Sequence, residues 1–315
     1  MSSTPLADHP ARAHPLLGIA YKVVGTILLS AMGALVKHMS TGYPVSEIVF
    51  FRSLFALAPV VVLMLASKER FGLLRTRHPW AHVRRSVIGC ISLATAFLTI
   101  RLLPFADATA LSFSAPLFVV IFAIPLLGER IGIYRLSAVF IGFIGMLMIA
   151  QPHVAGGPDV SGGSVGVAVG IMSAILISLA QITVRFASRT ERALTTVFYF
   201  SAASTLMSAM FLPFDWQTPG LADFVLLTLI GLLGGVAQIA FTQSYRYADA
   251  STLAPFDYAS LIWALILGLI FFGEFPQPMV IAGALVVVTS GLIIVFRERY
   301  LARQRRRVLA GSVNI

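Results

Sequence analysis

Long apolar stretches alternate with short polar segments along almost the whole chain. A helix that crosses the hydrocarbon core of a bilayer needs about 20 consecutive apolar residues. Ten stretches approach or reach this length, and the segments between them are too short for a soluble domain. The pattern therefore predicts an all-α membrane protein with ten transmembrane helices. They span roughly residues 16–37, 45–66, 85–103, 107–127, 132–150, 164–185, 194–213, 221–244, 249–272 and 278–296.

The composition agrees with this interpretation and excludes several other classes. Of the 315 residues, 58% are hydrophobic and only 11% are charged, whereas about 25% are charged in soluble domains. The net charge is +10, but the basic residues lie in short segments between apolar stretches, so nucleic acid is not an expected partner. The single cysteine, Cys90, excludes an internal disulfide. His78, His82 and His153 fall in predicted loops without metal-ligand spacing, and neither a metal nor a cofactor is expected.

The distribution of Lys and Arg predicts the orientation in the membrane. Twenty basic residues, Lys22 and Arg85 among them, are assigned to the N-terminus, alternate loops and the C-terminal tail, and only Lys37 and Arg101 to the opposite side. Cytoplasmic segments of membrane proteins are enriched in Lys and Arg. We therefore expect a multi-pass protein of the cell inner membrane with both termini in the cytoplasm.

The two halves of the chain resemble each other. With an offset of 148, Ser30 maps to Ser178, Lys37 to Arg185 and Phe50 to Phe198. Each half holds five helices, an odd number, so the second half is inverted relative to the first. Inverted repeats are typical of transporters, with the substrate site near the bilayer midplane between them. The predicted organisation is a cytoplasmic tail (1–15), a first repeat (16–150), a second repeat (164–296) and a basic cytoplasmic tail (297–315).

Three segments resemble a known family. They are EIVFFRSLFA at 47–56, ADATALSFSAPLFVVIFAIPLLGER at 106–130 and YASLIWALILGLIFFGE at 258–274. With the ten helices in two halves, they resemble EamA-type members of the drug/metabolite transporter superfamily over residues 16–296. The resemblance implies a central cavity lined by the first, third, fourth, sixth, eighth and ninth helices, with the fifth and tenth at the back. It also implies transport of amino acids, nucleotides or their precursors, vitamins, S-adenosylmethionine or drugs, and the first segment is similar to riboflavin and S-adenosylmethionine uptake proteins.

Charged residues inside the apolar stretches are costly and are therefore candidates for function. Asp257, in the ninth stretch, is interpreted as an ammonium contact, as a proton-coupling carboxylate or as a structural acid. Arg52 follows Glu47 by five residues, which places the two side chains roughly 140° apart on a helix, so each needs another partner. Arg52 then either ties two helices together or belongs to the site. Lys37 and Arg185 lie near helix ends and are expected to snorkel.

Uncharged polar and aromatic residues complete the predicted site. Ser178, Gln181 and Arg185 share one helical face by spacing, and polar groups in hydrocarbon need partners, so such stripes face either a cavity or another helix. Aromatic rings stack on planar solutes, although plain packing also explains them. Asp107 and Asp249 are expected to cap helix N-termini, and Gly128 and Gly273 to end helices in left-handed turns. The candidate substrate-binding or coupling residues are Asp257, Gln181, Gln238, Thr242, Tyr258, Trp263, Phe113, Phe256 and Arg52.

No catalytic motif is present, so the sequence does not predict an enzyme. It predicts a secondary transporter that moves a small neutral or zwitterionic metabolite by alternating access between inverted repeats, as a monomer or a homodimer. A riboflavin-like vitamin, an amino acid and S-adenosylmethionine are the candidate substrates. The alternatives are a drug or metabolite exporter of broad specificity, and a non-transporting membrane sensor or lipid-modifying enzyme.

Overall fold

The computed structural model describes residues 15–66, 74, 76, 79–127, 133–154, 163–187, 193–248, 253 and 256–312. Within these residues the regular structure is entirely helical, and nine helices are long and apolar enough to cross a membrane. The shorter apolar helix α11 belongs to the ninth predicted span. The all-α membrane fold is thereby confirmed. The elements are α1 (Pro15–Met39), α2 (Val45–Ala66), α3 (Pro79–Leu102), α4 (Phe105–Ser112), α5 (Ala115–Leu127), α6 (Ile133–Val154), α7 (Gly163–Ala187), α8 (Ala193–Ala209), η3 (Leu212–Phe214), α9 (Leu221–Tyr247), α11 (Ala259–Phe272) and α12 (Pro278–Ser312).

Three helices extend beyond the apolar stretches that predicted them. α3 begins at Pro79 and so includes His82 and Arg85, and α6 continues to Val154 and so includes His153. The assignment of these three side chains to loops was wrong. α12 runs on to Ser312, so the predicted basic tail is largely helical. Apolarity marks the part of a helix that lies in hydrocarbon, whereas Arg, Gln, Leu and Ala favour helix in water as well.

The fourth predicted span is a broken helix. α4 ends at Ser112, Phe113 and Ser114 form a turn, and α5 begins at Ala115. Pro116 has no N–H to donate, and its ring would collide with the carbonyl of Ser112 in a continuous helix. A similar turn at Tyr258 precedes α11 in the second repeat. Both repeats are therefore interrupted at corresponding places.

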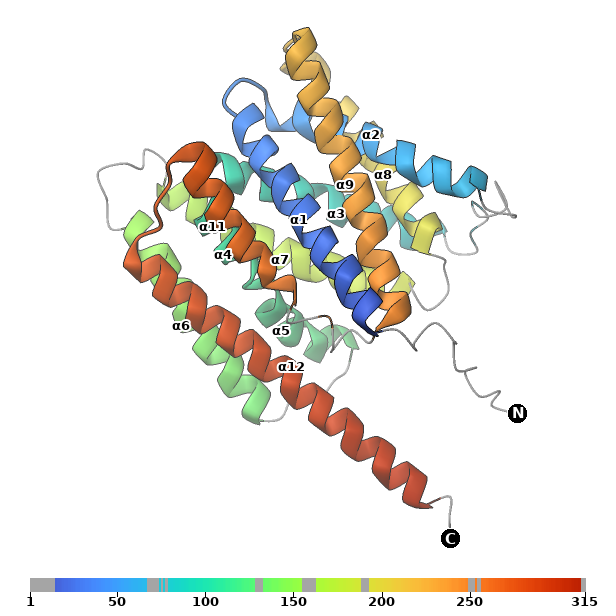
Figure 1. Cartoon of the computed structure of the whole chain (residues 1–315), viewed down its shortest axis with the longest axis vertical. Coiled ribbons are helices and arrows are strands. Elements are labelled where there is room, and N and C mark those ends of the chain that lie inside the picture. Colours follow the sequence, from blue (N-terminus) through green and yellow to red (C-terminus); the bar gives the residue numbers. More distant parts are fainter. Residues whose placement is uncertain are drawn as a thin grey trace.

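The helix packing has the symmetry of an inverted repeat. α1 packs along α9, and its counterpart α7 packs along α3, the counterpart of α9. α2 packs against its own counterpart α8, and α6 against its counterpart α12. Figure 1 shows the α6–α12 pair and the α2–α8 pair on opposite sides of the bundle. Exchange of the two repeats leaves this pattern unchanged, as expected for a pseudo-twofold axis that passes through both pairs.

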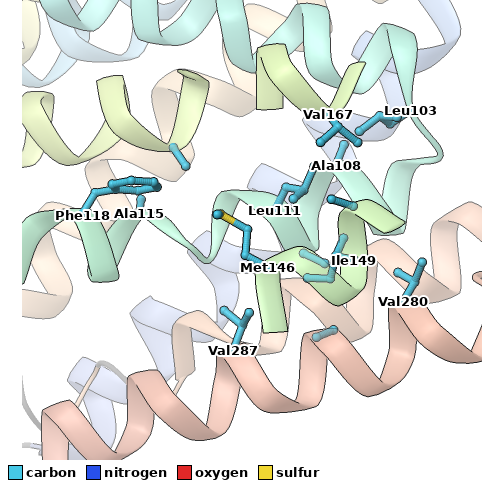
Figure 2. Packing of buried hydrophobic residues seen from close by; sticks show 14 residues of the cluster. Leu103, Ala108, Leu111, Ala115, Phe118, Met146, Ile149, Val167, Val280 and Val287 are labelled. Carbon is cyan, nitrogen blue, oxygen red and sulfur yellow. The ribbon is translucent and has the colours of Figure 1, made fainter. Parts of the chain in front are cut away.

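One apolar cluster joins the two halves. Leu111 and Ile149 of the first half and Val287 of the second are at most 1% exposed within it. Figure 2 shows residues of α4, α5 and α6 packed with Val167 of α7 and with Val280 and Val287 of α12. The repeats therefore share a core and do not form two separate domains.

α6 and α12 approach each other through glycines. A Cβ added at Gly283 would lie 2.6 Å from the carbonyl oxygen of Gly145, and one added at Gly145 would lie 2.8 Å from that of Gly283. The Ser290 hydroxyl also donates to the carbonyl of Ala138 across this contact. Small residues allow such close backbone approach, from which membrane helices derive packing energy.

We expect Gly283→Ala to lower the free energy of unfolding by about 1–3 kcal/mol, because the added methyl group meets backbone rather than a flexible side chain. Gly42→Ala is the matched control, since no atom lies within 4 Å of a Cβ at that position. Thermal unfolding in detergent compares the two variants. Equal Tm values for Gly283→Ala and Gly42→Ala would contradict the close contact.

Candidate functional site

Asp257 forms an ion pair with α1. Its Oδ1 lies 2.6 Å from Nζ of Lys22, whose side chain is 2% exposed, whereas that of Asp257 is 40% exposed. Nζ of Lys22 also lies 4.5 Å from the centre of the Phe241 ring of α9. Lys22 was predicted to belong to a cytoplasmic segment, but the structure buries it inside the bundle. The pair brings together the two repeats, because Lys22 belongs to the first and Asp257 to the second.

Aromatic side chains surround the two helix breaks. The rings of Phe113 and Tyr258 are 4.9 Å apart between centres. Phe256 and Trp263 are half-buried nearby in the chain, and the indole Nε1 of Trp263 is buried with no hydrogen-bond partner among the described residues. Discontinuous helices at the repeat interface are where transporters place their substrate sites. Three predicted residues, Asp257, Tyr258 and Phe113, thus lie at or beside the paired breaks.

The polar stripes behave differently from one another. Ser178 is fully buried and donates to the carbonyl of Ile175, whereas Gln181 is exposed, so the two do not share one environment as predicted. Gln238 is half-buried on α9, and the side chain of Thr242 lies outside the described residues, as does that of Arg185. On α1, the hydroxyl of Ser30 lies 3.4 Å from the carbonyl of Ser260 on α11. Ser30, the repeat counterpart of Ser178, therefore contacts another helix.

A second ion pair joins the repeats at the opposite end of α1. We call the end of the bundle where residues 40–44, 103–104 and 273–277 connect helices the Lys37 end, and the end where α1 begins the Lys22 end. Nζ of Lys37 lies 2.7 Å from Oε1 of Glu274 and donates to the carbonyl of Leu103 over 2.6 Å. The expectation that Lys37 snorkels was wrong, because a carboxylate from the other repeat lies within its reach.

Glu274 also caps a helix of the other repeat. Its Oε2 accepts a 2.7 Å hydrogen bond from the backbone N–H of Phe105, the first residue of α4. Asp107 does not cap α4 as predicted; its Oδ2 lies 2.8 Å from Nε2 of His153, and both side chains are buried. Asp249 and Gly128 lie outside the described residues. Gly273 ends α11 with φ 63°, which confirms the predicted left-handed turn.

Two cavities adjoin these pairs at the Lys37 end. One, of about 300 Å³, is lined among others by Lys37, Arg101, Asp107, His153 and Glu274. The other, of about 360 Å³, shares Lys37 and Arg101 and adds Ser40 and Phe272. The smaller cavity is thus lined by charged groups of both repeats, in the size range of small-molecule sites.

Two arginines lie inside the bundle on one aromatic ring. Arg52 of α2 is 5% exposed, and its guanidinium carbon lies 5.7 Å from the centre of the Phe200 ring. The guanidinium carbon of Arg85 of α3 lies 4.5 Å from the same centre. Glu47 is bonded elsewhere, since its Oε2 accepts from the N–H of Gln217 over 3.1 Å. The sequence identified only Arg52 as an arginine inside the bundle, and the structure shows that Arg85 also contacts the same ring there.

Comparison with known proteins identifies the family. The model of the EamA-like transporter family matches residues 16–151 and 164–296. A solved crystal structure with 18% sequence identity has the same fold, with a TM-score of 0.64 over 90% of this chain and 98% of that chain. The resemblance seen in the sequence is thereby confirmed.

The curated relatives are transporters of small molecules. The chain is 32% identical to the pseudopaline exporter CntI of Pseudomonas aeruginosa over 87% of this chain and 94% of the relative. It is 29% identical to the riboflavin transporter of Rhizobium johnstonii, over 97% and 98% of the two chains. It is 25% identical to the S-adenosylmethionine uptake transporter of Rickettsia bellii, over 90% and 94%. These relatives are named as transporters and not as enzymes. The chain is therefore a multi-pass membrane transporter that belongs to the EamA-like transporter family.

Proposed function

We propose that the protein is a secondary carrier that moves a small neutral or zwitterionic metabolite across the cell inner membrane by alternating access. The observation that carries this proposal is the double bridging of α1. Lys22 and Lys37, on one helix of the first repeat, each pair with an acid of the second repeat, Asp257 or Glu274. Breaking one pair while keeping the other opens one end of the bundle at a time.

The candidate substrates follow from the relatives and from the ring pair. Riboflavin and S-adenosylmethionine are the solutes named for two relatives, and amino acids share the zwitterionic head of the latter. The Phe113 and Tyr258 rings offer flat apolar faces, which stack on planar groups. Asp257 is already neutralised by Lys22 in this structure, which does not favour a purely cationic solute.

Counterflow in proteoliposomes tests the carrier function. Vesicles that hold the purified protein are loaded with one unlabelled solute, and uptake of the same labelled solute is followed for riboflavin, S-adenosylmethionine and a set of amino acids. We expect saturable exchange for at least one of them. A membrane sensor or a lipid-modifying enzyme would give only the leak of empty vesicles for every solute.

Export is the second candidate. The pseudopaline exporter shares 32% identity with this chain, a higher identity than that of the S-adenosylmethionine uptake transporter or of the riboflavin transporter. A broad-specificity exporter would release preloaded solutes of several classes from intact cells. A carrier selective for one metabolite would release only that solute.

The orientation is a separate prediction. Without Lys22 and Arg85, which lie inside the bundle, eighteen basic residues remain assigned to one side and two to the other, so both ends of the chain are expected in the cytoplasm. Figure 1 shows α1 beginning and α12 ending at the same end of the bundle. A reporter fused after Arg307 should behave as cytoplasmic, and one placed between Pro152 and Gly163 as periplasmic. Reversed reporter activities would contradict this topology.

A further inference from the structure

Arg52 and Arg85 form a buried cationic cluster that the packing of the fold alone does not explain. Their guanidinium groups lie on the Phe200 ring at 5.7 and 4.5 Å from its centre. Nε and Nη1 of both residues are buried with no hydrogen-bond partner in the part of the chain that the structure describes. Unpaired buried charges carry a large desolvation cost. The cluster therefore has the donors of an anion site.

The described acids do not neutralise this cluster. Five of the six carboxylates whose side chains the structure describes are bonded elsewhere: Glu47 to Gln217, Asp107 to His153, Asp223 to Tyr43, Asp257 to Lys22 and Glu274 to Lys37. The sixth, Asp215, is exposed just after η3. None of the six described carboxylates therefore supplies a counter-charge to the two guanidinium groups.

Two glycines make room for the two arginines. A Cβ at Gly89 would collide with Nη1 of Arg85 and would lie 2.7 Å from the Phe200 ring. A Cβ at Gly234 on α9 would lie 3.2 Å from Nε of Arg52 and 2.9 Å from the sulfur of Met32 on α1. Arg52 therefore points toward α1 and α9, which pack along each other.

The cluster also lies on the pseudo-twofold axis. Arg52 and Phe200 are equivalent positions, since the offset of 148 that relates Phe50 to Phe198 also relates these two. They contact each other across the α2–α8 pair, through which the axis passes. In inverted-repeat transporters the substrate binds near the midplane at the interface of the repeats. The cluster therefore lies at the interface of the two repeats, at the α2–α8 contact.

We propose that Arg52 and Arg85 bind a carboxylate group of the transported solute; this rests on the proposed carrier function and narrows its substrate to carboxylate-bearing metabolites. Guanidinium groups match the planar carboxylate with paired hydrogen bonds. The face of the Phe200 ring contacts both guanidinium groups and attracts them through cation–π interactions. A neutral vitamin without an acidic group is excluded as the main substrate by this site.

The first test needs no ligand. Arg52→Met and Arg85→Met are purified, and their thermal unfolding is compared with that of the parent and of Arg84→Met, a neighbouring exposed arginine. Because each cluster variant removes an uncompensated buried charge, its Tm is expected to stay equal or rise by a few degrees. A clear fall in Tm for either variant, with no fall for Arg84→Met, would show that the arginines are structural and would overturn the proposal.

The second test uses matched pairs of probes in a thermal-shift panel. L-phenylalanine and L-methionine are compared with their amides, which keep the ammonium group and side chain and lack the carboxylate. We expect the acids to raise the Tm of the parent and of Arg84→Met at concentrations at least roughly tenfold lower than the amides need. In Arg52→Met and Arg85→Met we expect acids and amides to act at equal concentrations. Equal shifts by acids and amides, no shift by any acid, or stabilisation by phenyl phosphate alone would each overturn the carboxylate assignment.

Counterflow separates failure of this site from failure of the carrier function. Saturable exchange of a neutral solute that is unchanged in Arg52→Met would uphold the carrier and overturn the carboxylate site. Carboxylate-dependent stabilisation without exchange of any of the same probes would uphold the site and contradict transport.

Discussion

The Asp257→Asn variant is expected to insert and fold but to lose most transport. Its transport rate should fall roughly tenfold or more below that of the parent. The amide keeps the size of the side chain but removes its charge. Lys22, 2% exposed, then loses its ion-pair partner at 2.6 Å. Removal of one partner from a fully buried pair costs about 3–5 kcal/mol, and the 40% exposure of Asp257 makes the cost smaller here. Counterflow and detergent Tm measure the two effects.

A double variant separates function from stability. Lys22→Met with Asp257→Met removes both charges and leaves no unpaired group, so we expect its Tm to recover toward that of the parent. Its transport should remain low. Asp223→Asn is the control, because Asp223 bonds only Tyr43 at the Lys37 end among the described residues. Transport by the double variant at the parental rate would show that the pair is only structural.

Lys37→Met is expected to open the Lys37 end. The substitution removes the ion pair to Glu274 and the bond to the Leu103 carbonyl. Loss of about 1–3 kcal/mol from one state of a two-state equilibrium changes the population ratio by roughly 5–150-fold. Ser40, which is 2% exposed and lines a cavity there, should then become accessible.

The measurement is the rate at which a thiol reagent modifies Ser40→Cys in a Cys90→Ser background. We expect Lys37→Met to raise this rate by about tenfold, because the contact with Glu274 holds this end closed. Lys37→Arg should keep the parental rate, and His38→Gln, an exposed neighbour, should leave it unchanged. An unchanged rate in Lys37→Met would contradict a role for the pair in closure.

Hydrophobic periodicity and length predicted the helices because a bilayer imposes both locally. The same criterion misplaced charged residues at the margins of the spans. Arg85, the first residue of the third predicted span, was counted with the basic loop before it, although α3 begins at Pro79. Lys22, seven residues into α1, carried a detectable signal: a lysine that far inside an apolar stretch needs a partner within the bundle.

The pairings themselves were not predictable from the sequence. Lys22 and Asp257 are joined only by the register of α1 against the segment before α11, and no local pattern sets that register. Asp107 precedes a helix-favouring stretch, which made it a reasonable capping residue, but Glu274 from the other repeat takes that role. Residues that contact each other across the repeats depend on tertiary structure, and these are the residues that the proposed mechanism uses.

The central claim is that the two ends of the bundle open in alternation, and a pair of spin-label distances tests it most directly. In a Cys90→Ser background, labels at exposed Thr41 and Gln277 report on the Lys37 end, and labels at exposed Trp80 and Tyr300 report on the opposite end. Double electron–electron resonance is recorded for each pair with and without Lys37→Met. Alternating access predicts that the Thr41–Gln277 distance lengthens while the Trp80–Tyr300 distance shortens. A change at one end with no change at the other, or lengthening at both, would contradict the account.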